Sequence, residues 1–288
     1  MSIKACLAAL LVVAIWGFNF IPIKLGVAEI PGLALLALRY LFTGLIFAPF
    51  MKWPGKEQAI AIMLVGVFMG ILHHGLLYVG MKYMPSGLMS LLTQSNVIFA
   101  TLIAMIFFKE NIGWRTWAGI GIGLLGLAVL TGSPDLSAPT IGYVLAFASA
   151  FFAALALTSM KKVDEVRPMT YLALSHLPIA PVIILMSLVT EGTDWITHPE
   201  TVNWTIVSAV LAFHVFVLGF SHVLWQKLMT KFPMSVIVPW TLLIPVFAVF
   251  PAAFILDEPI TTTIMVGGAF TIAGIGIITF RKIKRNAT

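Results

Sequence analysis

The sequence predicts an all-α polytopic membrane protein, in which ten transmembrane helices form two inverted five-helix repeats. Apolar stretches of 18 to 24 residues recur from end to end, and each can cross roughly 30 Å of hydrocarbon as a helix. Only 10% of the residues are charged and the mean hydropathy is +1.04, whereas soluble domains carry about 25% charged residues. The second half of the chain also partly repeats the first at a fixed offset.

The ten predicted spans follow one another with short connections. They cover 4–24, 32–50, 58–80, 85–108, 114–131, 140–160, 169–189, 203–226, 234–256 and 262–280. Only helices or closed barrels satisfy the backbone in lipid, and the continuous apolar runs exclude the alternating pattern of a barrel. The first span is interpreted as retained, because WGFNFIPIK follows where a signal peptide would have its cleavage region. The longest connection, about 190–202, is too short for a folded domain.

The basic residues predict the orientation of the chain. If both termini lie inside, fourteen Lys and Arg residues fall on the inner side and only Lys24 and Lys82 on the outer side. Such a bias predicts an N-in, C-in topology. The net charge of +6 is therefore an insertion signal, and it does not indicate a nucleic-acid partner. The basic tail RKIKR at 281–285 is expected to lie on the anionic headgroups of the lipid bilayer.

An internal repeat relates the two halves of the chain. An offset of 148 residues aligns the pairs His74/His222, Pro85/Pro233, Thr93/Thr241, Glu110/Glu258, Gly119/Gly267 and Gly126/Gly274. An offset of 136 relates the starts of the halves, and it aligns Arg39–Tyr40 with Ser175–His176. We expect a first repeat at 1–133, a second repeat at 138–283 and a basic tail at 284–288. Five spans is an odd number, so the second repeat is inverted, as in many secondary transporters with a binding site near the midplane.

Several motifs resemble a known family. They are WGFNF followed by Lys24, Arg39–Tyr40, MPSGLMSLL, Glu110 and the spacing Gly119-x6-Gly126. Together they resemble the EamA-like transporters of the drug/metabolite transporter superfamily, over nearly the whole chain. The stretch 84–110 is most similar to the bacterial cysteine and O-acetylserine exporter branch. The resemblance implies a ten-helix transporter that moves small metabolites, often amino acids, outward across the inner membrane. The second half departs from the pattern, with Phe152–Ala153 where the first half has Trp-Gly.

Polar residues within spans usually face a bundle interior or a cavity, which makes them candidate substrate contacts. Ser90, Gln94, Val97 and Thr101 share one face of a predicted helix, with Gln94 roughly 14 Å below the outer edge. We expect this stripe to line the substrate path, and a hydrogen bond between helices is the alternative for Gln94. Asn96 points elsewhere and serves either the substrate or helix packing.

The first two spans supply three more candidates. Trp16 offers a flat ring and one N–H donor to a small amphipathic cargo, and Asn19 lies on the same face. Arg39 is the one strongly charged side chain inside a span, and it needs an acceptor. The available acceptors are a carbonyl, Gln94, Asn19 or a substrate carboxylate, which an arginine binds through two parallel hydrogen bonds. Packing of Trp16 and a structural network around Arg39 are the alternatives.

His74, His222 and Trp240 complete the predicted substrate-binding set. Histidine titrates near neutral pH, so these residues either relay protons or simply hydrogen-bond within the bundle. Glu110 and Glu258 stand at span ends, where we interpret them as helix-end anchors. Prolines at 22, 178, 181, 239, 245 and 251 predict kinks in the first, seventh and ninth spans.

The favoured function is a secondary exporter of small amino-acid-type metabolites that works by alternating access. A flippase or transporter of a lipid-linked or other amphipathic metabolite is the alternative. An intramembrane enzyme is disfavoured, because no H-E-x-x-H motif and no carboxylate within a predicted span is present. The sequence predicts no cofactor and no metal, lacks a P-loop for ATP and has a single cysteine, Cys6. The partner is a small-molecule substrate, and a homodimer is left open.

Overall fold

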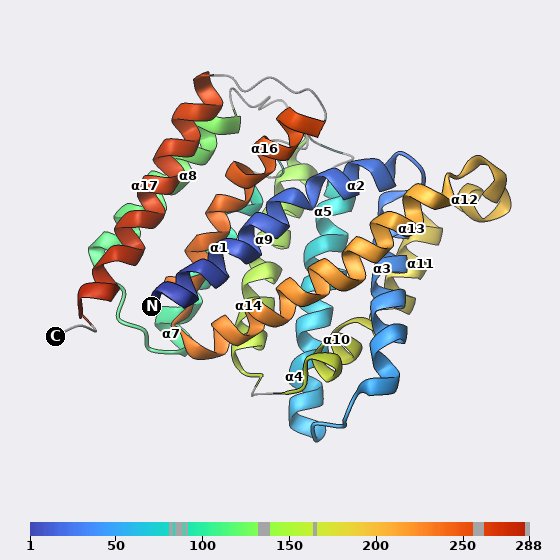
Figure 1. Ribbon diagram of the computed structural model, residues 1–288, viewed down its shortest axis with the longest axis horizontal. Helices are drawn as coiled ribbons and strands as arrows, with labels where there is room; N and C mark the ends of the chain where they lie inside the picture. The colour runs from blue at the N-terminus through green and yellow to red at the C-terminus, as the bar shows by residue number, and fades with distance from the viewer. Residues whose placement is uncertain are drawn as a thin grey trace.

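The computed structural model describes residues 1–80, 83, 89, 92–131, 139–163, 166–255 and 262–285. Every regular element in these ranges is a helix (Figure 1). Several predicted features lie outside the described residues. They are Lys82, Pro85, Ser90, most of the motif MPSGLMSLL, Glu258 and the last three residues of the basic tail.

The helices of the first half run from the N-terminus to Thr131. They are α1 (Ile3–Phe18), α2 (Phe20–Val27), α3 (Gly32–Phe47), η1 (Ala48–Phe50), α4 (Lys56–Gly66), η2 (Val67–His74), α5 (Gly75–Gly80), α7 (Asn96–Phe107) and α8 (Trp114–Thr131).

The second half begins with the long helix α9 and ends with α17. Its helices are α9 (Thr140–Lys161), α10 (Pro168–His176), α11 (Ala180–Thr190), α12 (Asp194–Thr197), η3 (Pro199–Thr201), α13 (Trp204–Ala212), η4 (Phe213–Leu218), α14 (Gly219–Lys231), α15 (Met234–Ile237), η5 (Val238–Leu243), α16 (Ile244–Ile255) and α17 (Thr262–Arg285).

These helices fall on all ten predicted spans. Six continuous helical stretches are long and apolar enough to cross a membrane: Ile3–Val27, Gly32–Phe50, Lys56–Gly80, Thr140–Lys161, Pro168–Thr190 and Trp204–Lys231. Four shorter apolar helices lie within the other predicted spans, at Asn96–Phe107, Trp114–Val129, Met234–Val249 and Met265–Ile278.

The kinks predicted from proline coincide with irregular helix geometry in three spans, at Pro22, Pro178 and Pro239. The first span breaks at Asn19, three residues before Pro22, and the seventh breaks between α10 and α11 at Pro178. In the ninth span, Pro239 lies in the 3-10 segment η5. The physical reason is the same in each case, because proline has no N–H to donate and its ring clashes with the preceding helical turn.

Two π-helical segments interrupt the third and eighth spans, and the sequence analysis did not predict them. They are η2, which ends at His74, and η4, which contains His214. A π-helical turn widens the helix locally and is often found at functional sites. In this protein the two widened segments lie on helices that the repeat aligns with each other.

Helices α8 and α17 pack side by side along a row of glycines (Figure 1). A Cβ atom on Gly119 would lie 2.7 Å from the carbonyl oxygen of Gly274, and one on Gly126 would lie 2.6 Å from that of Gly267. The two backbones therefore touch without side chains between them, as small residues allow in membrane helices. We call these four residues the glycine seam.

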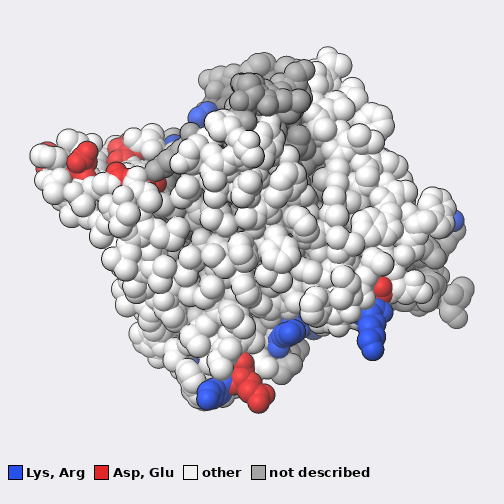
Figure 2. Space-filling model, turned by 180° about the vertical axis from the view of Figure 1, so that it is seen from behind, with Lys and Arg blue, Asp and Glu red and all other residues white. Residues whose placement is uncertain are grey.

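Charged side chains gather at opposite rims of the molecule. On the face shown in Figure 2, a broad uncharged surface separates a group of acidic residues at one end from most of the basic residues, which lie with a few acidic ones at the other end. Large apolar side chains are exposed between the rims, including Leu185, Phe216 and Phe220 at 61%, 59% and 55%. Such a belt is suited to contact with lipid tails.

Candidate functional site

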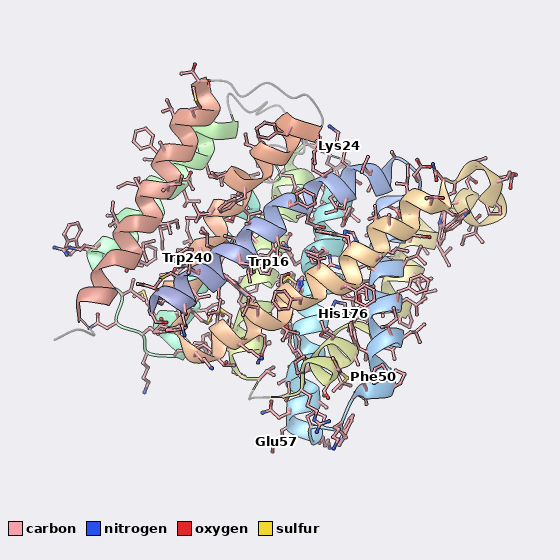
Figure 3. All side chains as sticks on the ribbon, in the orientation of Figure 1. Trp16, Lys24, Phe50, Glu57, His176 and Trp240 are labelled. Atoms are coloured by element: carbon pink, nitrogen blue, oxygen red, sulfur yellow. The ribbon has the colours of Figure 1, made fainter. Side chains whose placement is uncertain are left out.

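Four contacts between aromatic or basic side chains form a continuous path in the interior of the helix bundle. The Arg39 guanidinium lies 5.7 Å from the Tyr40 ring centre, and the Tyr40 ring lies 4.5 Å from that of His176. The His176 ring is 6.4 Å from that of His222, which is 5.4 Å from the Trp16 ring. Figure 3 shows Trp16 and His176 among the helices, whereas Lys24, Phe50 and Glu57 lie near helix ends. The path runs from α3 through α10 and α14 to α1, so both halves of the chain contribute.

His74 joins this group from η2. Its ring is close enough to Arg39, His176 and His222 to interact electrostatically with all three. The neighbouring His73 ring, 4.8 Å away, is held by Ser149 of α9, whose Oγ lies 2.9 Å from His73 Nδ1. We call the six residues of this group the central cluster. They are Trp16, Arg39, Tyr40, His74, His176 and His222.

Arg39 is a buried cation without a carboxylate partner. It is 6% exposed, and its Nε atom has no hydrogen-bond partner. None of the acidic side chains that the structure describes forms an ion pair with it. Two predicted acceptors, the side-chain oxygens of Asn19 and Gln94, are also unpartnered. A buried charge in this state is costly unless a counter-ion arrives, so the site is prepared for an anionic group.

Trp16 uses its only donor within the protein. Its Nε1–H donates to Ser221 Oγ at 2.9 Å, and the Ser221 hydroxyl donates to the Leu218 carbonyl at 2.7 Å. In this structure the indole N–H is therefore used within the protein, and its contact with the cargo stays a prediction. The indole ring itself packs against His222 and Trp225.

The predicted stripe in the fourth span is only partly correct. Gln94 is 8% exposed, with its Oε1 atom unpartnered. Val97 and Thr101 are 0% and 1% exposed, so they pack against other helices and do not line a cavity. The helix is interrupted at 94–95, where Ser95 Oγ donates to the Leu92 carbonyl at 2.6 Å. Such side-chain bonds to the backbone compete with the helical pattern, so the straight-helix stripe does not hold.

Three other predicted residues lie outside the hydrogen bonds and ring contacts of the central cluster. Asn19 stands at the break between α1 and α2, and Asn96 begins α7. Trp240 is 7% exposed in η5, where it belongs to the main hydrophobic core. A polar atom of each side chain is buried and unpartnered: Oδ1 of both asparagines and Nε1 of the tryptophan.

Sequence reasoning missed Tyr40 and His176 as site residues, although a signal for them existed. The 136-residue offset aligns Tyr40 with His176, and residues that an inverted repeat relates meet when they lie on its axis. His214 was missed as well. It is 3% exposed, neither of its ring nitrogens has a partner, and it interacts electrostatically with Arg39 and His222.

The ends of two helices are held by carboxylates. Glu110 accepts hydrogen bonds from the Met234 and Ser235 amides at 2.8 and 3.2 Å and from Ser235 Oγ at 2.6 Å. The interpretation of Glu110 as a helix-end anchor is therefore confirmed. Glu191, which was not singled out, accepts from the Leu33 and Ala34 amides at the start of α3. A carboxylate at a helix N-terminus satisfies free N–H groups and complements the helix dipole.

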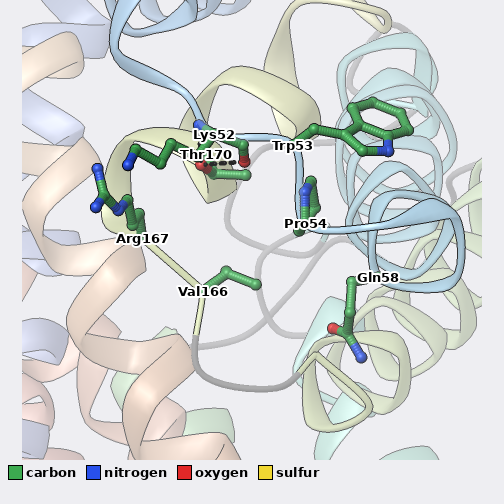
Figure 4. A pocket seen from close by; sticks show the side chains of 7 residues that line it. All are labelled: Lys52, Trp53, Pro54, Gln58, Val166, Arg167 and Thr170. Carbon is green, nitrogen blue, oxygen red and sulfur yellow. Dashed lines mark hydrogen bonds between the residues drawn. The ribbon is translucent and has the colours of Figure 1, made fainter.

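A separate hollow of about 340 Å³ lies at the basic rim (Figure 4). Lys52, Trp53, Pro54 and Gln58 line it from the connection after α3 and from α4, with Val166, Arg167 and Thr170 opposite. Thr170 Oγ1 accepts from the Lys52 amide at 2.9 Å and donates to the Lys52 carbonyl at 3.0 Å. These bonds join the end of the second span to the start of the seventh, so the hollow lies at an end of the helices and the central cluster in their interior.

A bundle of apolar helices around buried basic and aromatic side chains is the arrangement of a membrane transporter. The model of the EamA-like transporter family matches residues 3–132 and 140–280. The chain belongs to the EamA-like transporter family and is a multi-pass membrane transporter, as its motifs predicted.

Curated relatives match over their whole length. A probable amino-acid metabolite efflux pump of Salmonella typhimurium is 31% identical and matches 100% of this chain and 99% of its own. The protein of the same name in Escherichia coli K12 is 28% identical over 100% and 98%. The uncharacterized transporter YvbV of Bacillus subtilis is 25% identical over 98% and 93%. A solved structure titled "Crystal structure of protein" has a TM-score of 0.79 at 18% identity and covers 98% of this chain and 99% of its own, which shows a shared fold.

Proposed function

We propose that this protein is a secondary transporter that exports small amino-acid-type metabolites across the bacterial inner membrane. The observation that carries the proposal is Arg39, a cation buried between the two halves of the chain without a carboxylate partner among the described residues. An amino acid supplies the missing carboxylate, which the guanidinium binds through paired hydrogen bonds. The printed names of the two enterobacterial relatives, amino-acid metabolite efflux pumps, support the cargo class and the outward direction.

The transport cycle that we propose is alternating access between two inverted five-helix repeats, at 1–133 and 138–283. The family model matches two separate segments, one in each of these ranges. The glycine seam supports the inversion, because Gly119 meets Gly274 and Gly126 meets Gly267. The 148-residue offset aligns Gly119 with Gly267 and Gly126 with Gly274, so the two contacts exchange under the repeat, as a two-fold axis requires.

We place both termini on the cytoplasmic side. The basic rim then faces the cytoplasm and the acidic lobe around α12 faces outward, in agreement with the positive-inside rule. The proline breaks in the first, seventh and ninth spans supply the points at which helices bend between the two states. Glu110 closes the inner end of the path through α15, and Glu191 holds the outer end through α3.

The central cluster is the proposed binding site. Arg39 binds the carboxylate, and the rings of Trp16 and Tyr40 pack against the remainder of the cargo. Gln94, Asn19, Asn96 and Trp240 each have a buried polar atom without a partner, and we assign them to the cargo path or to helix contacts made in the opposite state. His74 and His222 complete the polar wall.

Uptake of labelled amino acids into proteoliposomes tests the proposal, with and without a pH gradient. The panel contains cysteine, O-acetylserine and other neutral amino acids. We expect saturable flux that Arg39→Gln abolishes and Gln94→Ala reduces. The matched control is Arg115→Gln, since Arg115 is exposed beside Trp114 at the start of α8. If protein that is shown to be folded transports no amino acid of the panel, the proposed cargo class is wrong. A lipid-linked or other amphipathic metabolite then becomes the favoured cargo.

A further inference from the structure

The hydrogen bonds of two histidines in the central cluster determine which ring nitrogen carries the proton. His176 Nδ1 lies 3.0 Å from the Leu172 carbonyl oxygen, and His222 Nδ1 lies 2.7 Å from that of Leu218. His176 Nδ1 also lies 2.8 Å from Ser175 Oγ, but that hydroxyl already donates to the Tyr171 carbonyl at 2.7 Å and therefore accepts from the ring. A carbonyl oxygen only accepts hydrogen bonds, so Nδ1 is the donor in both rings. In the neutral ring the other nitrogen, Nε2, then has a free lone pair and acts as an acceptor.

Both Nε2 atoms are available to a ligand. No hydrogen bond to either atom is formed within the described part of the chain. The two rings come from neighbouring helices, stand edge to face with 86° between their planes, and have their centres 6.4 Å apart. Tyr40 packs against one ring and Trp16 against the other. Two rings with acceptor nitrogens and two further aromatic rings thus lie next to one another, in a bundle whose described interior holds no carboxylate.

This combination selects for a positively charged hydrogen-bond donor. An anion would meet the lone pairs of Nε2, whereas an ammonium group donates N–H bonds to them and is attracted to the faces of aromatic rings. Arg39 is close enough to His74, His176 and His222 to interact electrostatically with each of them. A cation without a negative group, bound at the histidines, would therefore be repelled by Arg39. A zwitterion avoids this repulsion, because its carboxylate neutralises Arg39 while its ammonium group reaches the histidines.

We propose that His176 and His222 bind the ammonium group of the cargo through their Nε2 atoms, so that the site recognises a free α-amino acid at both of its charged groups. This inference rests on the proposed function and deepens it. It predicts that the transporter rejects two kinds of derivative for different reasons. An N-acetyl amino acid lacks the ammonium group, and an amino acid amide lacks the carboxylate.

The test uses the full-length protein in proteoliposomes and the labelled amino acid of the panel that has the largest saturable flux. Its unlabelled N-acetyl and amide derivatives are the competitors. We expect each derivative to compete at least about tenfold more weakly than the free amino acid, because a lost hydrogen bond to a charged group has about this effect on affinity. For each derivative we compare its inhibition constant with that of the free amino acid. In His176→Phe and His222→Phe, this ratio should fall about tenfold for the N-acetyl derivative and stay unchanged for the amide.

Several outcomes would overturn the inference. If the wild-type protein accepts the N-acetyl derivative as well as the free amino acid, the ammonium site is absent, and this result needs no variant. If the folded phenylalanine variants lower the ratio equally for both derivatives, or change neither ratio, the histidines have a structural role only. His198→Ala is the control, because that ring lies at the outer rim with a side chain 65% exposed. Failure of the proposed function looks different, since the wild-type protein would then show no saturable amino-acid flux at all.

Discussion

The glycine seam and the central cluster are two places where the first and second halves of the chain meet, and they are built in opposite ways. In the seam, backbone touches backbone, and an added Cβ at Gly119 or Gly126 would lie within 2.7 Å of the facing helix. In the central cluster, large rings meet at centre distances of 4.5 to 6.4 Å, and Arg39 Nε and His74 Nδ1 have no partner. The comparison shows how a helical transporter combines a close-packed contact with a site that is incomplete without its cargo.

The largest effect is expected from a substitution that breaks the seam. In Gly126→Leu, the new side chain would begin 2.6 Å from the Gly267 carbonyl oxygen and the Thr271 amide nitrogen, so α8 and α17 must separate. Even Gly126→Ala should lower the free energy of unfolding by about 1–3 kcal/mol. Thermal unfolding of the purified protein in detergent measures the change. Gly121 on the same helix is the control, because a Cβ there meets nothing within 4 Å. Equal melting temperatures for Gly126→Leu and Gly121→Leu would refute the close contact.

Removing the unpaired charge of the central cluster should separate stability from transport. Arg39→Gln eliminates a buried cation that lacks a carboxylate in the described structure, so the melting temperature should rise, by the equivalent of roughly 1 kcal/mol. The same substitution should abolish flux, since the carboxylate of the cargo loses its partner. Thermal unfolding and flux are measured on the same preparation, with Arg115→Gln as the matched control. A clear fall in the melting temperature would mean that Arg39 is already paired in the resting protein.

A moderate effect is expected where Glu110 holds the start of α15. Glu110→Gln keeps the shape of the side chain but removes the charge that accepts three hydrogen bonds from Met234 and Ser235. The cost should be about 1 kcal/mol of unfolding free energy, as for other helix caps. Chemical unfolding measures the unfolding free energy of the wild type and of Glu110→Gln. Glu200→Gln, at the exposed rim, is the control. An unchanged stability would show that water replaces the carboxylate without loss.

The smallest effect is expected from Trp16→Phe. The substitution removes the N–H donor that contacts Ser221 Oγ at 2.9 Å and retains an aromatic ring beside His222 and Trp225. The loss should be about 0.5–1.5 kcal/mol in stability, with the half-saturation concentration changed less than about threefold. Ser221→Ala should have a similar effect, and the double variant should add little to either. A tenfold loss of flux in Trp16→Phe alone would assign the indole N–H to the cargo.

Four residues of the central cluster were predictable from the sequence, because each is polar or aromatic within an apolar span. These are Trp16, Arg39, His74 and His222. The sequence also predicted the breaks at Pro22, Pro178 and Pro239, since the missing N–H of proline acts on its own helix. It did not place Tyr40 and His176 at the centre, and it assigned Val97 and Thr101 to a cavity that they do not line. Both errors concern the direction of a side chain, which depends on local helix geometry and on the neighbouring helices.

The sequence by itself determined where the chain forms membrane helices, because in lipid each segment must satisfy its own backbone hydrogen bonds and be apolar along its length. These requirements are local, so the amino-acid sequence alone is sufficient to assess them. Only the tertiary structure decided which polar groups of different helices meet and which groups remain unpaired. Such contacts join residues more than 100 positions apart, such as Tyr40 and His176, and packing of several helices selects them together. The composition of the spans therefore identifies a membrane protein, whereas the unpaired groups of the packed bundle define what it is able to bind.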